Sequence, residues 1–342
     1  MKTDVAKKVI GLAPRFSGRR KGSMLRRAFS LVLGVLLAFS VLSCSTQRLA
    51  PETSGVGNIE PSSSSIVVVV TMDFGKELVV ERKVPIYSGM TALDALRIIA
   101  DVGTEYSGGF VSSINGIASD KKRDWFLYLN GICANVGARD YILHPDDVVH
   151  WDFRDWSYQQ FVSAIIGDFP QPFRNGYAGK TAPTLVVYEA PFVSEAESLV
   201  SILKDSGVSQ VSAIACDQLS ADSKRHSNLI VIAGAHNNLI SELSNLHKKL
   251  GFYTRIQGEQ LYVLDTAGNV ASEYQDGWGL LQATQNPWNP KGTGACENVA
   301  LMVTGSNDEN VRHAVNALLS GGQELRYAFA AVIANGIVFK VP

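Results

Sequence analysis

In some segments of the chain, hydrophobic and polar residues alternate as in a β-strand. In others, the hydrophobic residues recur at the spacing of a helix. Ile66–Met72 is a β-branched run and Glu77–Val84 alternates apolar and polar residues, so the two are expected to pair as a β-hairpin. Between Leu93 and Ala100 the apolar residues recur at spacings of three and four, which is typical of one face of a helix. Thr91, with an acidic residue three positions later, predicts the N-cap of that helix.

Three more β-rich runs follow the predicted helix. They are Phe110–Ile117, Trp125–Gly131 and Val148–Phe153. Asn115-Gly116 and Asn130-Gly131 suit type I′ hairpin turns, in which both central residues need a positive φ. The order of hairpin, helix and three β-rich runs predicts a small mixed sheet with one helix packed across it.

These elements predict an α+β domain of the β-grasp type over residues 66–166. Trp156–Ile166 is expected to form a short helix that closes this domain. Residues 167–183 contain several proline and glycine residues without a helical period, which is typical of a linker. We therefore predict that the ranges 66–166 and 184–342 fold separately, each around its own core.

Residues 184–342 alternate strands and helices. Buried-type strands at Thr184–Tyr188, Asn228–Ala233 and Val299–Thr304 each precede a helical pattern, and Ala330–Val341 predicts a terminal hairpin. Repeated strand–helix units of this kind predict an α/β domain with a mainly parallel sheet and helices on both faces.

The beginning of the chain has the pattern of an export signal. Met24 is followed by two arginines and by an apolar run of about 15 residues, Ala28–Leu42, which is shorter than the ~20 residues of a spanning helix. Val41-Leu42-Ser43-Cys44 resembles the bacterial lipobox, which implies cleavage before Cys44 and diacylglycerol on its sulfur. A single transmembrane anchor and a plain secretory signal are the alternatives.

On this interpretation residues 1–43 are a signal peptide that starts at Met1 or at Met24 and uses the Sec or the twin-arginine route. Residues 44–65 comprise the lipidated cysteine and a flexible linker, which is rich in serine and poor in large apolar residues. The expected location is the outer face of the cytoplasmic membrane or the cell envelope, with the lipid as the membrane contact.

Charge is distributed unevenly between the signal and the rest of the chain. Residues 1–43 contain nine Lys or Arg residues and one acid, although the whole chain has a formal net charge of −1. The remaining 22 basic and 31 acidic residues give the exported part a net charge of −9. Because affinity for nucleic acid comes mainly from neutralised phosphates, we expect no nucleic-acid partner.

No arrangement of reactive side chains predicts catalysis. The six histidines lack metal-ligand spacing, and no serine occupies a Gly-x-Ser-x-Gly elbow. Beyond Cys44 the cysteines are Cys133, Cys216 and Cys296, with no Cys-x-x-Cys motif, and a Cys216–Cys296 bridge stays open. We therefore predict that the protein is not an enzyme and has no metal site or cofactor.

Three features of residues 184–342 are candidates for ligand binding. Gly234 and Gly305 each follow a strand and precede a helix, the position where open α/β sheets bind ligands. Neither belongs to a Gly-x-Gly-x-x-Gly or Walker motif, so a nucleotide is not the expected ligand. Trp288, in the rigid loop Asn286–Pro290, is a candidate ligand contact, and a fixed crossover is the alternative.

The first domain resembles the C-terminal domain of transcobalamin and intrinsic factor, above all its bacterial relatives in surface proteins and lipoproteins. The segments that carry the resemblance are Gly89–Leu96, Phe110–Ile117, Trp125–Gly131, Val136–Tyr141 and Val148–Phe153. Asp146-Asp147 stands where this family usually has Gly-Asp before the last strand. Asp tolerates a left-handed backbone better than most residues, so we expect the turn to survive the change. The helical barrel that forms the opposite half of the cobalamin site in transcobalamin is absent from this sequence.

The resemblance implies ligand capture and not chemistry. The surface that matches the cobalamin-facing side would contain Asn115, Tyr128, Asn130, Asn135 and Arg139, all at turns or strand ends. The alternative for the aromatic residues is a place in the core, and the alternative for the Asn-Gly pairs is a purely structural turn.

Together these observations predict a membrane-anchored extracytoplasmic lipoprotein that binds a small-molecule ligand, with a corrinoid such as cobalamin as the candidate. Residues 184–342 also resemble modules of archaeal surface-layer proteins. The alternative function is therefore a structural or adhesive role in the cell envelope, with envelope proteins as partners.

Overall fold

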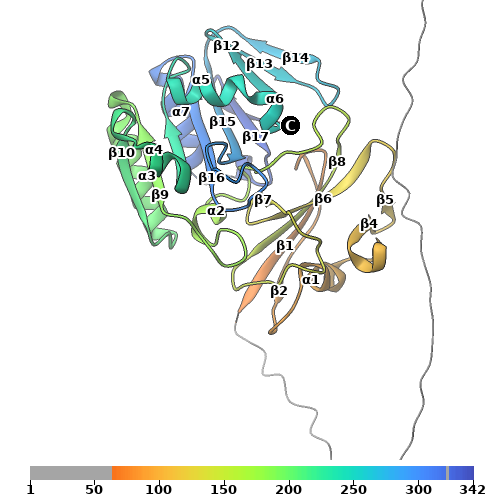
Figure 1. Ribbon diagram of the computed structural model, residues 1–342. Coiled ribbons are helices and arrows are strands. Elements are labelled where there is room, and N and C mark those ends of the chain that lie inside the picture. Colours follow the sequence, from red (N-terminus) through yellow and green to blue (C-terminus); the bar gives the residue numbers. More distant parts are fainter. Residues whose placement is uncertain (1–63, 321–322) are drawn as a thin grey trace, which may run out of the picture. The chain divides into compact units, whose positions relative to one another are not determined.

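The computed structural model describes residues 64–320 and 323–342, which belong to one compact unit (Figure 1). The predicted signal peptide, Cys44 and the linker up to residue 63 lie outside the described residues, so they stay predictions. Within the described part, no helix combines the length and the apolar character needed to cross a bilayer.

The first sheet has the strand order β2-β1-β8-β6-β7. Its strands are β1 (Ser65–Met72), β2 (Glu77–Pro85), β6 (Arg123–Leu129), β7 (Ile132–Cys133) and β8 (Val148–Asp155). β1 pairs antiparallel with β2 and parallel with β8, and β6 pairs antiparallel with β8, so the sheet is mixed. The pairing of β1 with β2 is the hairpin that the first two hydrophobic runs predict.

Helix α1 (Ala92–Ile99) packs against one face of this sheet. The Thr91 hydroxyl accepts a hydrogen bond from Asp94 N–H at 3.1 Å, and the Asp94 carboxylate accepts one from Thr91 N–H at 3.0 Å. This capping box confirms the predicted N-cap. Leu93 and Leu96 of the helix are buried in one cluster with residues of β1, β6 and β8. A small sheet, β3-β4-β5, is built from β3 (Val102–Glu105), β4 (Phe110–Ile114) and β5 (Ile117–Ala118).

The two predicted Asn-Gly turns have the expected backbone. Asn115 and Gly116 have φ of 50° and 79°, and Asn130 and Gly131 have φ of 54° and 79°. Asp146, where the sequence departs from the usual glycine, has a φ of 63°, so the turn survives the change as predicted.

Residues 156–166 do not form the predicted helix. Their hydrogen bonds go to distant segments: Cys133 N–H donates to Ser163 C=O at 3.0 Å. The guanidinium of the fully buried Arg154 donates to Gln159 C=O at 3.0 Å. The prediction was wrong because tertiary partners satisfy backbone groups of this irregular segment, which removes the need for a local helical ladder.

The second sheet is mixed, with the order β10-β9-β11-β16-β15-β17-β18. Its strands are β9 (Thr184–Tyr188), β10 (Val211–Ala215), β11 (Asn228–Ile232), β15 (Trp278–Gln285), β16 (Val299–Gly305), β17 (Ala330–Ala334) and β18 (Ile337–Val341). β10, β9, β11 and β16 pair in parallel, whereas β15, β17 and β18 join antiparallel. The prediction of a mainly parallel sheet therefore holds for β10, β9, β11 and β16 only. In the other half, the two-residue turn between β17 and β18 allows antiparallel pairing only.

Both faces of the second sheet are covered (Figure 1). One face packs against α3 (Val193–Asp205) and α7 (Asp308–Leu319). The other packs against α5 (Asn238–Asn245), α6 (His247–Leu250) and a three-stranded sheet of β12 (Thr254–Gln257), β13 (Gln260–Leu264) and β14 (Val270–Tyr274). Two short helices, α2 (Gln171–Arg174) and α4 (Ala221–His226), complete the helices of the described residues.

Hydrophobic clusters join the two predicted domains. In one, the rings of Phe74 and Tyr253 lie 5.0 Å apart and those of Tyr128 and Phe329 lie 5.3 Å apart. Residues 167–183, predicted as a linker, include α2 and the buried Phe173, which packs with the second sheet. The boundaries at residues 166 and 184 stay predictions. Because the two ranges share hydrophobic clusters, their separate folding needs a direct test.

Candidate functional site

Two of the predicted ligand contacts are engaged inside the protein. Tyr128 is fully buried, and its hydroxyl donates to Val162 C=O at 3.0 Å. Asn130 is also fully buried, and its Nδ2 donates to Asp147 Oδ1 at 2.8 Å and to Gly176 C=O at 2.9 Å. The alternatives that the sequence left open, a core position for the tyrosine and a structural turn for the asparagine, account for both residues.

The three exposed candidates of the first domain do not gather at one place. Asn115 Oδ1 accepts from the N–H of Asp101 at 3.0 Å, at the tip of the β4–β5 turn. Asn135 Nδ2 donates to the carbonyl of Gly294 at 3.1 Å, and Arg139 donates to a carbonyl of the turn before β4. Each side chain thus fixes a different loop.

Trp288 is held by charged neighbours in the second half of the chain. Its Nε1 donates to Glu242 Oε2 at 2.7 Å, and Lys224 Nζ lies 4.2 Å from the ring centroid. These contacts fit the fixed crossover that is the alternative to a ligand contact.

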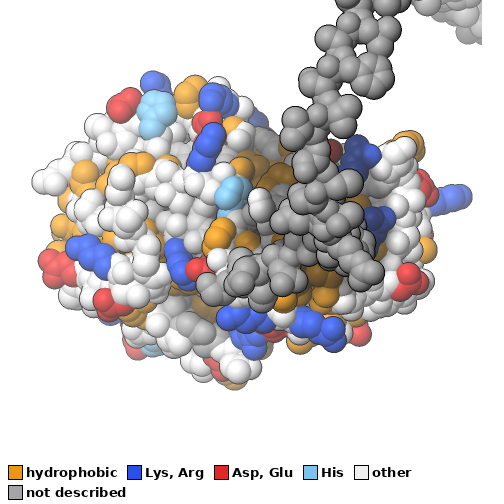
Figure 2. Space-filling model, turned by 90° about the horizontal axis from the view of Figure 1, so that it is seen from below, with side chains coloured by type: hydrophobic (Ala, Val, Ile, Leu, Met, Phe, Trp, Pro, Cys, Tyr) orange, Lys and Arg blue, Asp and Glu red, His pale blue; other side chains and the backbone are white. Residues whose placement is uncertain are grey.

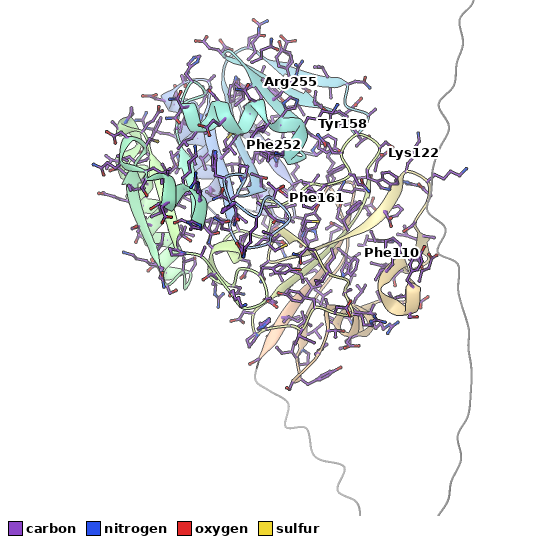
Figure 3. The ribbon with its side chains drawn as sticks, viewed as in Figure 1. Phe110, Lys122, Tyr158, Phe161, Phe252 and Arg255 are labelled. Atoms are coloured by element: carbon purple, nitrogen blue, oxygen red, sulfur yellow. The ribbon has the colours of Figure 1, made fainter. Side chains whose placement is uncertain are left out.

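A groove in the first domain is the best-formed candidate site, and we call it the β6 groove. It is lined by residues 109–111, by residues 124–127 of β6, by the loop after β7, and by Trp151, Trp156 and Gln160, and its volume is about 330 Å³. Figure 3 labels Phe110, at the β4 side of the groove. Pockets of a few hundred Å³ with aromatic lining are typical of small-molecule sites.

Two glycines hold the walls of the β6 groove together. A Cβ on Gly137 would lie 2.7 Å from the carbonyl oxygen of Gly109, closer than a real side chain permits. Gly137 belongs to the loop after β7 and Gly109 to the turn before β4, so the absence of a side chain allows these two backbones to meet at the rim.

Trp151 supplies a polar group that nothing in the described chain satisfies. Its side chain lines the groove and is 3% exposed, and its Nε1 has no hydrogen-bond partner among the described residues. Trp125, by contrast, donates from Nε1 to Ile117 C=O at 2.9 Å. A buried donor without a partner costs ~1–3 kcal/mol, so an acceptor supplied by a bound molecule would be stabilising.

Asp124 is the single charged side chain among the described residues that line the groove. Its Oδ1 accepts from the Ser119 hydroxyl at 2.5 Å and from Trp125 N–H at 2.8 Å, and Oδ2 has no partner in the described chain. Cys133 also lines the groove, and burial raises the pKa of its thiol to about 12. A thiol that stays protonated is a poor nucleophile, so the groove offers recognition and not covalent chemistry.

Most of the groove could not be predicted from the sequence. Phe110, Trp125, Trp151 and Trp156 come from separate segments, and only the fold brings them together. The one signal available was the concentration of tryptophan, since three of the five tryptophans fall between residues 125 and 156. Trp125 and Trp151 are also buried in the core of the first sheet, so this signal did not distinguish a binding site from a core.

A second hollow, of about 530 Å³, lies at the carboxyl ends of β9 and β10. Glu189 accepts from Gly234 N–H at 2.8 Å and from Asn237 Nδ2 at 2.8 Å. A carboxylate of this chain therefore occupies the donors that would otherwise attract an anion at the start of α5. Gly305 has a packing role, because a Cβ there would lie 2.6 Å from Val311 N.

The candidate Cys216–Cys296 bridge is not formed. Both residues and Cys133 are free. Cys216 lies in the second hollow beside Asn237, whereas Cys296 donates from its thiol to Cys133 C=O at 3.4 Å. The fold places the two cysteines in different surroundings, which spacing along the chain does not reveal.

A buried ionisable network lies between the two predicted domains. His150 Nδ1 is 3.2 Å from Asp168 Oδ1, and His150 Nε2 is 2.9 Å from Thr71 Oγ1, which donates to Asp152 Oδ1 at 2.7 Å. Burial acts to lower the pKa of His150, but the carboxylates of Asp168, Asp152 and Glu81 outweigh it and raise the pKa above its ordinary value. Thr71, His150 and Asp152 are fully buried, so no substrate reaches this relay and its role is structural.

No cluster of three or more His, Cys, Asp or Glu suited to a metal ion occurs within residues 64–320 and 323–342. On the face shown in Figure 2, Lys and Arg side chains are interspersed with Asp and Glu. That face therefore lacks the single-sign patch that is typical of a nucleic-acid surface.

Comparison with known proteins places the groove in a recognised domain. Residues 89–155 match a family described as a domain of unknown function, DUF4430, and this range contains α1, β3 to β8 and most of the groove. No curated protein matches the chain. A haptocorrin structure in complex with Cbi is 14% identical, with a TM-score of 0.24, and the match covers 27% of this chain and 25% of haptocorrin. A candidate metal binding protein from Ruminococcus gnavus is 16% identical, with a TM-score of 0.22, over 27% of this chain and 97% of that protein.

Proposed function

We propose that this chain is a lipid-anchored extracytoplasmic protein that captures a small ligand in the β6 groove and does not transform it. The observation that carries the proposal is Trp151, whose side chain lines the groove and whose buried Nε1 lacks an acceptor among the described residues. The protonated thiol of Cys133 supports binding without catalysis, and so does the lack of a second charged side chain among the described residues of the groove.

A corrinoid is the candidate ligand that this proposal favours. Corrinoids carry amide side arms, whose carbonyls are acceptors for a donor such as Trp151 Nε1. A groove of about 330 Å³ is too small for a whole corrin ring, so one side arm would enter while the ring stays outside. The aromatic wall formed by Phe110 and Trp156 would then contact the apolar edge of the ring.

The test is native mass spectrometry of the purified protein with cobalamin and with cobinamide. A 1:1 complex is expected with at least one of them. Trp151→Phe keeps a ring and removes the donor, so we expect affinity to fall about 3- to 10-fold, the effect of one lost hydrogen bond.

Trp278→Phe is the matched control, because Trp278 Nε1 donates to Glu259 C=O far from the groove along the second sheet. It should leave the affinity unchanged. Equal weakening by both variants would mean that general destabilisation, and not the groove, sets the affinity. No complex with either corrinoid would rule out the corrinoid as ligand.

A further inference from the structure

The outer edge of β6 carries two backbone groups without partners. Leu127 C=O accepts from Ala134 N–H at 2.9 Å, and Arg123 C=O accepts from Asp120 N–H at 2.9 Å. Both carbonyls therefore point away from β8, and the backbone of Trp125, midway between them, points the same way. Trp125 N–H donates to Asp124 Oδ1 at 2.8 Å.

Trp125 C=O and Leu127 N–H then remain, and neither has a partner among the described residues. The loop after β7 makes one hydrogen bond to this edge and then diverges, so the ladder stops there. Both residues line the β6 groove, and the two free groups point to the edge of β6 that faces away from β8. Open strand edges of this kind are templates for pairing with another backbone.

The spacing of the two groups is that of a strand ladder. In a parallel ladder, one residue donates its N–H to the carbonyl of residue i−1 on the facing strand and accepts from the N–H of residue i+1. Trp125 and Leu127 stand in this relation to Phe126. In an antiparallel ladder, the same two groups pair with the two residues that flank the one facing Phe126, so they fit an extended backbone of either direction.

We propose that the β6 groove also binds an extended peptide segment, whose backbone pairs with Trp125 C=O and Leu127 N–H. This inference rests on the proposed binding function and adds a second class of ligand. Backbone pairing gives affinity, and the groove walls contact the alternate side chains. Trp125 and Trp151 lie on one face of the sheet and Phe126 lies on the other, so they face different sets.

Charge indicates one side chain of the bound peptide. Asp124 precedes Trp125, so it lies beside the peptide position at one end of the two free backbone groups. Its Oδ2 is free of partners in the described chain, and no other charged side chain of the described residues lines the groove. A peptide with a cation at that position, either a free amino terminus or a lysine, complements the site.

The probe is a hexapeptide that begins with lysine and alternates valine and threonine, titrated into the full chain by calorimetry and by fluorescence of the groove tryptophans. Single N-methylation along the peptide should weaken binding about tenfold at one position, and at most twofold at the next, because alternate N–H groups of a strand point to opposite sides. A uniform response along the peptide would overturn pairing with the β6 edge.

Asp124→Asn removes the charge and keeps an oxygen that accepts from Ser119 and Trp125, so the fold should survive. We expect the variant to bind the peptide about 3- to 10-fold more weakly than the wild type. This difference should be smaller at high salt, because salt screens the ion pair. Asp101→Asn, a change of the same charge at an exposed position outside the groove, is the control and should have no effect. Equal effects of the two variants would overturn the assigned role of Asp124.

The outcomes separate this inference from the function on which it rests. If cobinamide binds and is weakened by Trp151→Phe while the hexapeptide does not bind, the groove is a ligand site but the peptide assignment is wrong. If neither probe binds, the proposed function fails with it. Binding of the hexapeptide with a position-dependent N-methylation profile supports both.

Discussion

The turn between β6 and β7 offers a sharp test of how the first sheet is held to the rest of the chain. Gly131 has a φ of 79°, and a Cβ built on it would lie 3.1 Å from Pro172 Cγ and 3.3 Å from Ile165 O. Gly116 has the same φ in the other Asn-Gly turn, but no atom would lie within 4 Å of a Cβ built there. The two glycines thus share a backbone conformation and differ in their surroundings.

Gly116→Ala should destabilise the protein by roughly 1 kcal/mol. A left-handed non-glycine residue costs ~1–2 kcal/mol, partly offset by ~0.4–1 kcal/mol from the lower entropy of the unfolded chain. Gly131→Ala has the same backbone and entropy contributions as Gly116→Ala. In addition, its new methyl group would crowd Pro172 and Ile165, and overpacking of this kind typically costs ~1–3 kcal/mol. We therefore expect Gly131→Ala to cost about 2–4 kcal/mol.

Urea unfolding of the wild type and the two variants measures the difference directly. For a chain of this size, each 1 kcal/mol corresponds to a Tm shift of about 2–4 °C, so Gly131→Ala should melt clearly below Gly116→Ala. Pro172→Ala removes the crowding Cγ and should recover part of the loss in the Gly131→Ala background. Equal destabilisation by the two glycine variants would refute the packing of residues 165–172 against this turn.

Three further outcomes are expected. Cys44→Ala should leave an uncleaved precursor without a fatty-acid label, and equal labelling of variant and wild type would contradict the lipobox assignment. Residues 167–183 should resist limited proteolysis of the folded protein, because Phe173 is buried against the second sheet, and early cleavage there into two stable fragments would restore the prediction of two separately folded domains. The raised pKa of His150 implies stabilisation that is complete below about pH 6.5 and is lost as pH rises through the folded pKa, so urea unfolding should show this decline in wild type and not in His150→Gln.

The sequence determined the local structure of the first domain. The Thr91 cap, the hairpin of β1 and β2 and both Asn-Gly turns occur where the pattern predicts them. Each is decided by residues within a few positions of one another, since capping bonds, turn φ values and strand alternation depend on near neighbours. The strands of the second domain were predicted for the same reason.

Only the tertiary structure decided the rest. The segment 156–166 is irregular and not helical because its backbone partners lie on β7 and elsewhere. The second sheet is mixed because β15, β17 and β18 join it antiparallel. The β6 groove unites Phe110, Trp151 and the free edge at Trp125 and Leu127, which belong to different strands. The sequence contains these residues, but which donors stay unpaired depends on where other segments stop pairing, and that is a property of the folded chain.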